Sequence, residues 1–442
     1  MAGKDGPAPP APANGGNGRL GHNAATDWYR DGRAHVWLPY TQMQNTAPVP
    51  AVASAEGVHL TLSDGRVLVD GIASWWTACH GYNHPHIVVA VEEQNRTLQH
   101  VMFAGLAHEP AYKLAARLSD LLPGDLGHVF FSDSGSVSVE IALKMALQYW
   151  TNKGVEGRNR FLCFRGGYHG DTMAAMAVTD PGNAFHAAFR GVLPEAIVSD
   201  IPQSQADLDA LDSLIAKHRD SLAAIIVEPL VQAAGGMKMH APEILAAIRK
   251  SAKRHDVLFI ADEIFTGFGR TGTLFACEGA EIVPDIICLG KAIAGGAMSL
   301  AATAATDEVY DAFLSDDPAK ALMHGPTFMA NPLACAAANA SLDLFESEPR
   351  LKQAAAIEAM LKEGLEPCRG QPGVKDIRIK GAIGAVQMEG PVDTTALSTR
   401  FQEEGVFIRP FGDIIYLTPA FIIEQAELAT LTGAIRRIVE AD

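Results

Sequence analysis

Two charged residues follow two short apolar segments in the middle of the chain, and their types suggest a specific chemistry. Asp262 comes directly after the apolar segment 257–261, and Lys291 comes two residues after the segment 286–289. Short segments that are continuously apolar and rich in β-branched residues are typical of strands buried on both faces of a parallel sheet. Because open parallel sheets bind ligands at the carboxyl ends of their strands, we expect an acid and an amine at a ligand site.

An amine near a carboxylate is what pyridoxal 5′-phosphate (PLP) requires of a protein. The amine forms an imine with the aldehyde of PLP, and the carboxylate keeps the pyridine nitrogen protonated, so that the ring withdraws electrons. Either charge alone is more often simply the first residue that returns to water after a buried strand. The two together, with Gly295 and Gly296 after the lysine, favour the cofactor interpretation.

The same stretch contains a glycine pattern that resembles a dinucleotide-binding motif. Residues 267–272 fit G-x-G-x-x-G, which must open a crossover helix in a dinucleotide-binding fold. The segment that follows, 273–279, is too short for such a helix and ends at a glycine. We therefore predict a loop here.

A serine- and glycine-rich loop at 132–136 precedes a predicted helix at 137–150. Ile141, Met145 and Tyr149 recur every four residues and share one face of that helix. The free N–H groups and positive dipole at its start, with Gly135 and Ser136, suit a phosphate. Ordinary capping by serine is an equally good explanation of this loop taken alone.

The positions of the apolar segments predict the fold. Strands ending at 131, 164, 227, 261 and 289, separated by helical segments, predict an α/β fold with a doubly wound, mostly parallel sheet. Tyr168 follows one of these strands and could stack on a flat ring, and Glu228 follows another. We predict a disordered tail at 1–27, an N-terminal segment of a small domain at 28–72, a large PLP-binding domain at 73–335 and a C-terminal small domain at 336–442.

Other aromatic and charged residues outside this sheet are candidates for substrate contacts. Residues 28–43 are aromatic but irregular, and Tyr40 there could face a ligand, although packing is the commoner role. Of the adjacent Trp75 and Trp76, we expect one in the core and the other at a pocket. Arg409 ends a predicted strand and could bind a carboxylate through two hydrogen bonds.

Composition excludes several classes of protein. The chain has 442 residues, 48% of them hydrophobic, and a net charge of −16, which argues against binding nucleic acid. No apolar run approaches the roughly 18 residues of a membrane span, and the tail lacks the features of a signal or transit peptide, so we expect a cytoplasmic protein. The six cysteines are scattered and predict buried thiols. His80, His84 and His86 lack a nearby acid or cysteine that would complete a ligand set, so we expect no metal.

Several motifs resemble those of class III aminotransferases, which have PLP fold type I. They are Ser134-Gly-Ser136, Gly167-Tyr-His-Gly170, Asp262-Glu263, Thr266-Gly-Phe-Gly-Arg270 and Gly290-Lys291. Further strings resemble, more narrowly, the adenosylmethionine–8-amino-7-oxononanoate aminotransferases of biotin synthesis. These are Trp37-Leu-Pro-Tyr-Thr41, Ser74-Trp-Trp76, Asp133-Ser-Gly-Ser-Val137, the string KMALQYW at 144–150, His324-Gly-Pro-Thr-Phe328 and Arg409-Pro-Phe411.

The resemblance implies a role for each matching residue. Lys291 would carry the cofactor and act as the catalytic base, and Tyr40 would contact both substrates. The other implied cofactor contacts are Gly135, Ser136, Tyr168, Glu228, Asp262, Pro326 and Thr327. Thr327 would reach the phosphate from a neighbouring subunit, so a homodimer is implied. The implied substrate contacts are Trp75, Tyr168, Lys291, Gly325 and Arg409.

The implied reaction is a ping-pong transfer of an amino group from S-adenosylmethionine to 8-amino-7-oxononanoate, which gives 7,8-diaminononanoate. One alternative is a broader ω-aminotransferase that acts on diamines or on β- and ω-amino acids, against which the tryptophan pair and Tyr40 argue. Another is a non-catalytic regulator with a PLP fold, which would not need both Lys291 and Asp262. The sequence departs from the family pattern at Phe265, at Ala233 and in Thr418-Pro-Ala-Phe421, and these departures affect the shape of the pocket.

Overall fold

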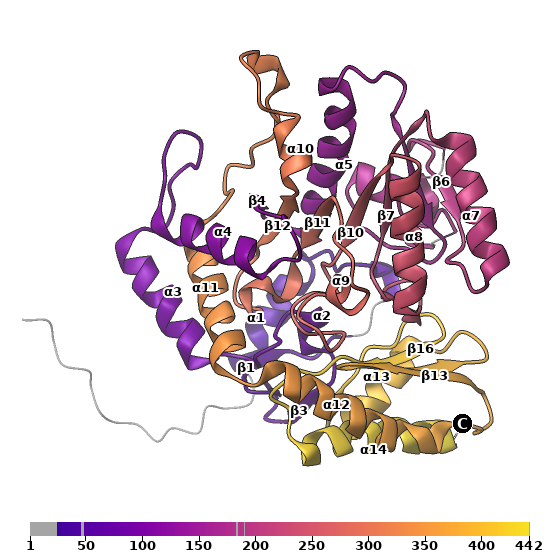
Figure 1. Cartoon of the computed structure of the whole chain (residues 1–442). Helices are drawn as coiled ribbons and strands as arrows, with labels where there is room; N and C mark the ends of the chain where they lie inside the picture. The colour runs from indigo at the N-terminus through magenta and orange to yellow at the C-terminus, as the bar shows by residue number, and fades with distance from the viewer. Residues whose placement is uncertain (1–23, 46–47, 183, 190, 442) are drawn as a thin grey trace, which may run out of the picture.

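The computed structural model describes residues 24–45, 48–182, 184–189 and 191–441 (Figure 1). Its centre is a seven-stranded sheet in the order β4-β12-β11-β10-β7-β5-β6. The strands are β4 (His128–Ser132), β5 (Arg160–Phe164), β6 (Ile197–Ser199), β7 (Leu222–Val227), β10 (Leu258–Asp262), β11 (Ile286–Leu289) and β12 (Ala301–Ala305). All five strands predicted from the sequence are present, with ends within one residue of the predicted ones.

The sheet is mostly parallel, as predicted. β10 pairs in parallel with both β7 and β11, and β5 pairs in parallel with β6 and β7. Only β12 runs against its neighbours, β11 and β4, in this sheet as described. The sequence analysis missed β12 because alanine has a low strand propensity, and it missed β6 because three residues give almost no pattern. In the pairing of β10 with β11, Asp262 lies opposite Cys288, which places the ends of the two predicted strands side by side.

Both faces of this sheet are covered by helices, which explains why its strands are continuously apolar. Alternate residues of β10 belong to different cores: Leu258 and Ile260 pack on one face with α5 (Gly135–Asn152), and Phe259 and Ala261 pack on the other with α8 (Pro242–Arg254). The remaining helices of this part are α2 (Ala73–Trp76), α3 (Pro85–Thr97), α4 (Glu109–Leu121), α6 (Met173–Ala177), α7 (Gln205–His218), α9 (Ala276–Gly279), α10 (Asp307–Asp311) and α11 (Pro332–Ser347).

Two smaller sheets are built from residues near the chain ends, in the lower part of Figure 1. One joins β1 (Val52–Glu56), β2 (His59–Leu62) and β3 (Val67–Asp70) to β15 (Val406–Phe407), and the other joins β13 (Val374–Lys380), β14 (Ile383–Met388) and β16 (Ile414–Leu417). A two-residue pair, β8 (Val231–Gln232) and β9 (Lys238–Met239), is separate. The helices here are α12 (Arg350–Leu365), α13 (Thr394–Glu403) and α14 (Gln425–Ala441).

The parallel pairing of β3 with β15 brings together segments more than 300 residues apart in sequence, since Asp70 lies opposite Phe407. The predicted hairpin at 58–70 is confirmed as β2 and β3, and Gly65 in its turn has a φ of 90°. The boundaries of the predicted domains stay a prediction.

Two expectations about the N-terminal residues need comment, and one helix was not expected. Residues 28–33 are not irregular, because α1 (Ala24–Arg33) includes them and also takes in the end of the predicted tail. The rest of that tail, 1–23, lies outside the described residues. Helix α13, which has a mixed polar sequence, was not predicted.

The predictions about cysteines and histidines can be compared with their surroundings. All six cysteines are buried thiols. His80 binds Ser341 and Arg350, His84 caps α3, and His86 pairs with Asp343. Within the described ranges, no cluster of three or more His, Cys, Asp or Glu side chains could hold a metal ion, and no helix is long and apolar enough to cross a membrane.

Candidate active site

One pocket gathers most of the residues predicted from the sequence. It lies where β10 and β11 end, against segments from both ends of the chain. The predicted residues that line it are Tyr40, Trp75, Gly135, Ser136, Tyr168, Glu228, Asp262, Lys291 and Arg409. The strand ends supply the floor of the pocket, and the segments near the chain ends supply its mouth.

Lys291 lies at the floor, two residues after the end of β11, at the start of the short helix η3 (Lys291–Ala294). Its φ is 46°, in the left-handed region that non-glycine residues rarely adopt. Its Nζ lies 4.5 Å from the centre of the Trp76 ring. Burial lowers the pKa of Lys291, although Asp262 and Glu228 oppose this shift. A lysine with a lowered pKa is more often neutral, and the neutral amine is the nucleophile.

Asp262 ends β10 and is almost fully buried. Its Oδ1 accepts a hydrogen bond from the N–H of Ile264 at 3.1 Å, and its Oδ2 lies 2.7 Å from Nδ1 of the buried His169. With an ionised carboxylate, the histidine donates from Nδ1. Because both oxygens are held, the carboxylate has a fixed direction at the end of the strand.

Glu228 is a second carboxyl group at the floor, directly after β7. Its oxygens accept hydrogen bonds from the N–H groups of Tyr168 and Ala233, each at 3.0 Å. Burial and the nearby Asp262 raise the pKa of Glu228 to about 7. The side chain therefore ties the loop after β5 to the loop after β7.

The start of α5 lines the pocket through Gly135 and Ser136. Ser136 Oγ accepts a hydrogen bond from the N–H of Asp171 at 3.1 Å, so its own O–H can point elsewhere. A Cβ on Gly170 would lie 2.2 Å from Ser136 Oγ, and a Cβ on Gly135 would lie 3.0 Å from Ile264. Glycine is therefore needed at 170, and the site has the N–H groups and dipole that suit an anion.

Two tyrosines from distant segments meet at the mouth of the pocket. The hydroxyls of Tyr40 and Tyr168 lie 3.1 Å apart, and both donate to Oδ2 of Asp171, at 2.5 Å and 2.7 Å. His186 holds the other oxygen of Asp171 at 3.0 Å. Burial would raise the pKa of Asp171, but hydrogen bonds from His186 and the two tyrosines outweigh it and lower that pKa. Burial and Asp171 raise the pKa of Tyr40 to about 12.

Trp75 and Arg409 complete the mouth. The guanidinium carbon of Arg409 lies 4.8 Å from the centre of the Trp75 ring, and the Tyr40 ring meets the Trp75 ring edge-on, with centres 6.2 Å apart. Trp75 is 37% exposed, whereas Trp76 is buried, so the expected division of the tryptophan pair is confirmed. Trp76 also lines the pocket, which was not expected.

Three predicted residues are not brought to this pocket by their own chain. Gly325, Pro326 and Thr327 lie in a loop that does not line it, and Gly325 and Thr327 are exposed. Lys144 on α5 holds this loop by donating to the carbonyl oxygen of Met323 at 2.8 Å. The implied contribution of the loop to a neighbouring subunit stays a prediction.

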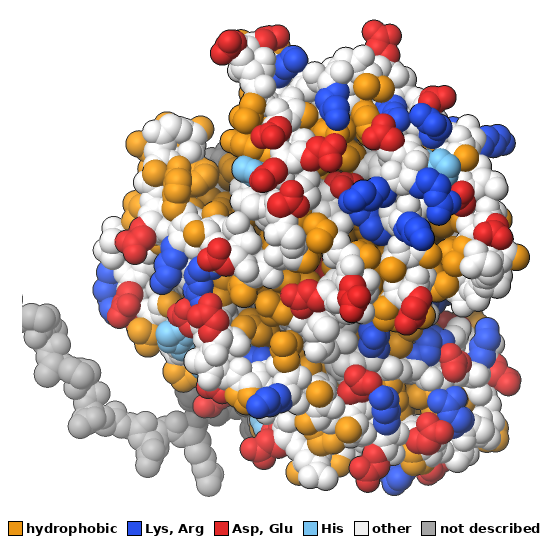
Figure 2. Space-filling model, in the orientation of Figure 1, with side chains coloured by type: hydrophobic (Ala, Val, Ile, Leu, Met, Phe, Trp, Pro, Cys, Tyr) orange, Lys and Arg blue, Asp and Glu red, His pale blue; other side chains and the backbone are white. Residues whose placement is uncertain are grey.

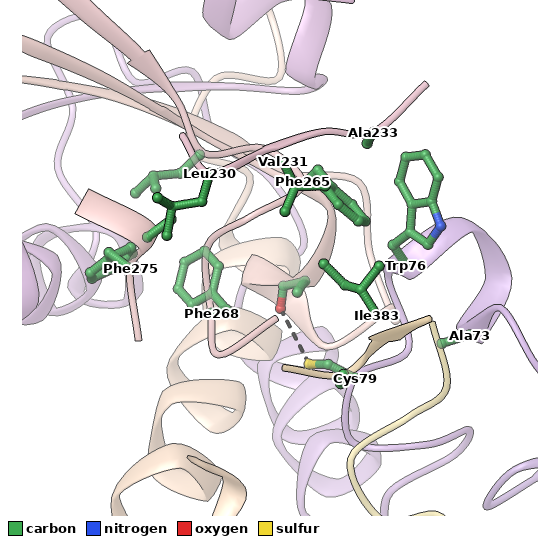
Figure 3. Close-up of a cluster of buried hydrophobic side chains, with 14 of the residues drawn as sticks. Ala73, Trp76, Cys79, Leu230, Val231, Ala233, Phe265, Phe268, Phe275 and Ile383 are labelled. Atoms are coloured by element: carbon green, nitrogen blue, oxygen red, sulfur yellow. Dashed lines mark hydrogen bonds between the residues drawn. The ribbon is translucent and has the colours of Figure 1, made fainter. Parts of the chain in front are cut away.

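The sequence analysis gave no role to several residues that line the pocket. His169 stands next to Tyr168 in the same motif, so its position was available, but its contact with Asp262 depends on tertiary structure. Phe265, noted as a departure, packs on Trp76 with ring centres 4.5 Å apart (Figure 3). Tyr416 lies in the buried strand β16, where its aromatic ring indicated only core packing.

The residues of the pocket fit PLP. Four features match its aldehyde, pyridine nitrogen, ring face and phosphate in turn: a half-buried amine with a lowered pKa, an oriented carboxylate, an aromatic ring, and a helix N-terminus that excludes side chains. The roles of the individual residues toward it stay predictions.

Comparison with known proteins gives independent information. Residues 40–439 match the family described as aminotransferase class-III. The chain is 44% identical over 413 residues to an adenosylmethionine-8-amino-7-oxononanoate aminotransferase from Corynebacterium glutamicum. The matched region covers 92% of this chain and 97% of the relative. A crystal structure of a protein with the same name from Methanocaldococcus jannaschii superposes with a TM-score of 0.89 at 32% identity, over 93% of this chain and 98% of the other. The structure of a PLP-bound amine transaminase from an uncultivated Pseudomonas species superposes with a TM-score of 0.85 at 32% identity, over 92% of this chain and 98% of the other.

Proposed function

The chain belongs to the class-III aminotransferase family, and on that premise we propose that it transfers an amino group from S-adenosylmethionine to 8-amino-7-oxononanoate, giving 7,8-diaminononanoate for biotin synthesis. The observation that carries this proposal is the pocket itself. It combines the reactive pair Lys291 and Asp262 with an aromatic and cationic mouth built by Trp75 and Arg409. The names of the relatives point to the same reaction.

The family and its PLP-bound relatives imply that the enzyme uses PLP, which supplies an electron-withdrawing ring that makes the Cα proton of a bound amine acidic. Lys291 Nζ would take that proton from Cα and return it to the neighbouring carbon, in the role of a general base and acid. Asp262 would hold a proton at the ring nitrogen, and the hydrogen bond from His169 would keep the carboxylate directed at it. Gly135 and Ser136 would hold the phosphate, and Tyr168 would lie against the ring.

The mouth of the pocket would select the substrate. Arg409 would bind a carboxylate, and Trp75 would cover the methylene chain between that carboxylate and the reacting ketone. The hydroxyls of Tyr40 and Tyr168 both donate to Asp171, which fixes the two phenol rings at the mouth, where a substrate would pass them. Pro410 and Phe411 line the pocket next to Arg409.

We infer that the active unit is a homodimer, because the loop with Gly325, Pro326 and Thr327 is held away from its own pocket. Hydrophobic side chains near this loop are exposed, including Met323 at 74% and Phe328 at 57%. Tyr112, in the first turn of α4, is 61% exposed, and Figure 2 shows hydrophobic side chains on the left-hand lobe, where α3 and α4 lie. A second copy that covers these side chains would place Thr327 at the neighbouring phosphate site.

A half-reaction experiment tests the proposed function and its amine donor. The enzyme loaded with PLP is mixed with S-adenosylmethionine, lysine, a diamine or a short ω-amino acid, and the loss of the visible PLP band is followed. We expect S-adenosylmethionine to bleach the band and the oxononanoate to restore it, with production of the diamine. If lysine bleaches the band and S-adenosylmethionine does not, the amine donor is lysine. If short ω-amino acids react and the oxononanoate does not restore the band, the enzyme is a broader ω-aminotransferase.

A further inference from the structure

The segment that presents the two tryptophans has an unusual backbone. Ala73, Ser74, Trp75 and Trp76 have φ values of 45°, 47°, 54° and 75°, and the ψ values of Ser74 and Trp75 are 61° and 46°. The N–H of Trp76 donates to the carbonyl oxygen of Ile72 at 2.9 Å. These values describe one turn of left-handed helix in residues other than glycine, a conformation that persists only where the surrounding structure enforces it.

Asp70, the last residue of β3, supplies the hydrogen bonds that fit this turn. Its Oδ1 accepts from the N–H of Ile72 at 2.8 Å, and its Oδ2 accepts from the N–H of Ser74 at 3.0 Å. The hydroxyl of Tyr82 donates to the same Oδ2 at 2.5 Å and lies 2.6 Å from Ser74 Oγ. Asp70 is only 2% exposed, and no arginine or lysine forms a described ion pair with it, so backbone N–H groups and one phenol compensate its burial.

The turn determines where both tryptophan rings lie. Trp76 packs on Phe265 and lies over the Nζ of Lys291 at the floor, as Figure 3 shows for the aromatic pair. Trp75 lies against Arg409 at the mouth. In a strand, two adjacent side chains point to opposite faces, and in a right-handed helix they diverge by about 100°. A left-handed turn is a third arrangement, and in this chain both adjacent rings line one pocket.

Asp70 is also tied to β15, the strand that precedes Arg409. It lies opposite Phe407 in the pairing of β3 with β15, and the N–H of Gly71 donates to the carbonyl oxygen of Phe407 at 3.0 Å. Arg409 follows two residues later. The carboxylate therefore stands between the two segments that build the substrate-selecting mouth, without lining the pocket itself.

We propose that Asp70 is a positioning residue for substrate selection, because its buried carboxylate holds residues 73–76 in the left-handed turn that places Trp75 and Trp76 in the pocket. This inference rests on the proposed function for the identity of the acceptor. The structural part of the inference, that the turn needs either a carboxylate cap or glycine, does not depend on the proposed function.

The decisive comparison uses glycine as a substitute for the cap. Asp70→Ala removes the hydrogen bonds that enforce positive φ, so the turn relaxes. Because glycine adopts positive φ without steric cost, adding Ser74→Gly should restore the turn in part. We expect Asp70→Ala to raise the KM of the oxononanoate at least tenfold and to change the near-ultraviolet circular dichroism of the tryptophans in cofactor-free protein. Asp70→Ala with Ser74→Gly should recover most of both changes, and Ser74→Gly alone should be close to wild type.

Asp64→Ala is the matched control, because Asp64 lies in the exposed turn of the same hairpin, away from the pocket. It should change neither readout. If Asp70→Ala does not fold, Asp70→Asn and Tyr82→Phe, which remove fewer hydrogen bonds, should give the same changes at smaller size. The proposal is wrong if Ser74→Gly gives no recovery, or if KM for donor and acceptor and kcat all change equally. If the oxononanoate is no substrate for wild type, the proposed function fails, while the dichroism and its recovery by glycine still decide the role of Asp70.

Discussion

The floor and the mouth of the pocket are built in different ways. At the floor, Asp262 ends one strand of the large sheet and is buried, and Lys291 follows the neighbouring strand and is half-buried. At the mouth, Tyr40 is 50% exposed and Trp75 is 37% exposed, and both lie outside that sheet, Trp75 in the left-handed turn 73–76. The floor thus uses rigid elements, which suit chemistry that needs fixed geometry, and the mouth uses segments that can vary without disturbing the sheet.

Because the floor and the mouth differ in this way, we expect changes in them to affect different kinetic constants. Changes at the floor should lower kcat with every donor and acceptor, because the same groups act on each substrate. Changes at the mouth should raise KM, to a degree that depends on the substrate.

Lys291→Ala should have the largest effect. It removes the group that binds PLP covalently and moves the proton, so we expect turnover to fall by at least about 10³-fold with every substrate. The visible band of the bound cofactor should shift, and the melting temperature should change little. Lys217→Ala, at an exposed position on α7, is the matched control. Normal turnover by Lys291→Ala would remove this lysine from the mechanism.

Asp262→Asn should come next. A neutral amide cannot hold the pyridine nitrogen protonated in a buried site, so we expect kcat to fall by roughly 10²-fold, which corresponds to about 2.7 kcal/mol. The fall should be similar for donor and acceptor half-reactions, measured by stopped-flow absorbance. A loss confined to one substrate would place Asp262 with the mouth rather than with the floor.

The floor was also the part that the sequence predicted best. Asp262 and Lys291 could be found because buried parallel strands are short, apolar and end where a ligand binds. The mouth could not be assembled in this way, since no local pattern shows that Tyr40, Trp75 and Arg409 converge. Only the resemblance to a family brought these three residues together.

Some contacts lie beyond both kinds of reasoning. His186 holds Asp171 through a hydrogen bond between side chains, and nothing in the residues around it marks it. The left-handed turn at 73–76 contains no glycine, the usual sequence sign of positive φ, so it could not be expected from local sequence. Strand β12 was missed because its alanines have little propensity for a strand, and pairing with β11 and β4 decides its conformation.

Glu228 offers a test of burial at the floor by pH. Its pKa is raised to about 7, so the fold favours the protonated form. The stability it contributes is fully present below its ordinary pKa of about 4.5 and is lost as the pH rises through about 7. Glu228→Gln stays neutral, so its stability relative to wild type should increase between pH 5 and pH 8, by on the order of 2 kcal/mol. Urea unfolding of cofactor-free protein at the two pH values measures this, and an unchanged difference would mean that Glu228 is ionised throughout.

Arg409→Ala tests the charge at the mouth. The substitution leaves a substrate carboxylate without its partner. Hydrogen bonds to charged groups contribute about 1.5–3 kcal/mol, and we expect the lower end of this range because solvent screens a partly exposed pair. We expect KM to rise by about tenfold or more for carboxylate-bearing substrates, the donor included. The carboxyl-free analogue of the acceptor should lose little. Arg436→Ala on α14 is an exposed control, and equal losses with and without the carboxylate would mean that Arg409 does not bind it.

Trp75→Ala is expected to have the smallest effect and is the sharpest test of the mouth. The substitution removes apolar contact, worth about 25 cal/mol per Å² of surface buried, from a ring that remains 37% exposed. A loss of about 1 kcal/mol would raise the KM of the oxononanoate roughly fivefold and leave kcat unchanged. Because Trp75 contacts the methylene chain rather than the carboxylate in our proposal, short ω-amino acids should be affected less than the oxononanoate. Trp37→Ala, which removes an 88% exposed tryptophan outside the pocket, is the matched control. If Trp75→Ala instead lowers kcat for all substrates, the ring acts with the floor, and the division between chemistry and selection fails at this residue.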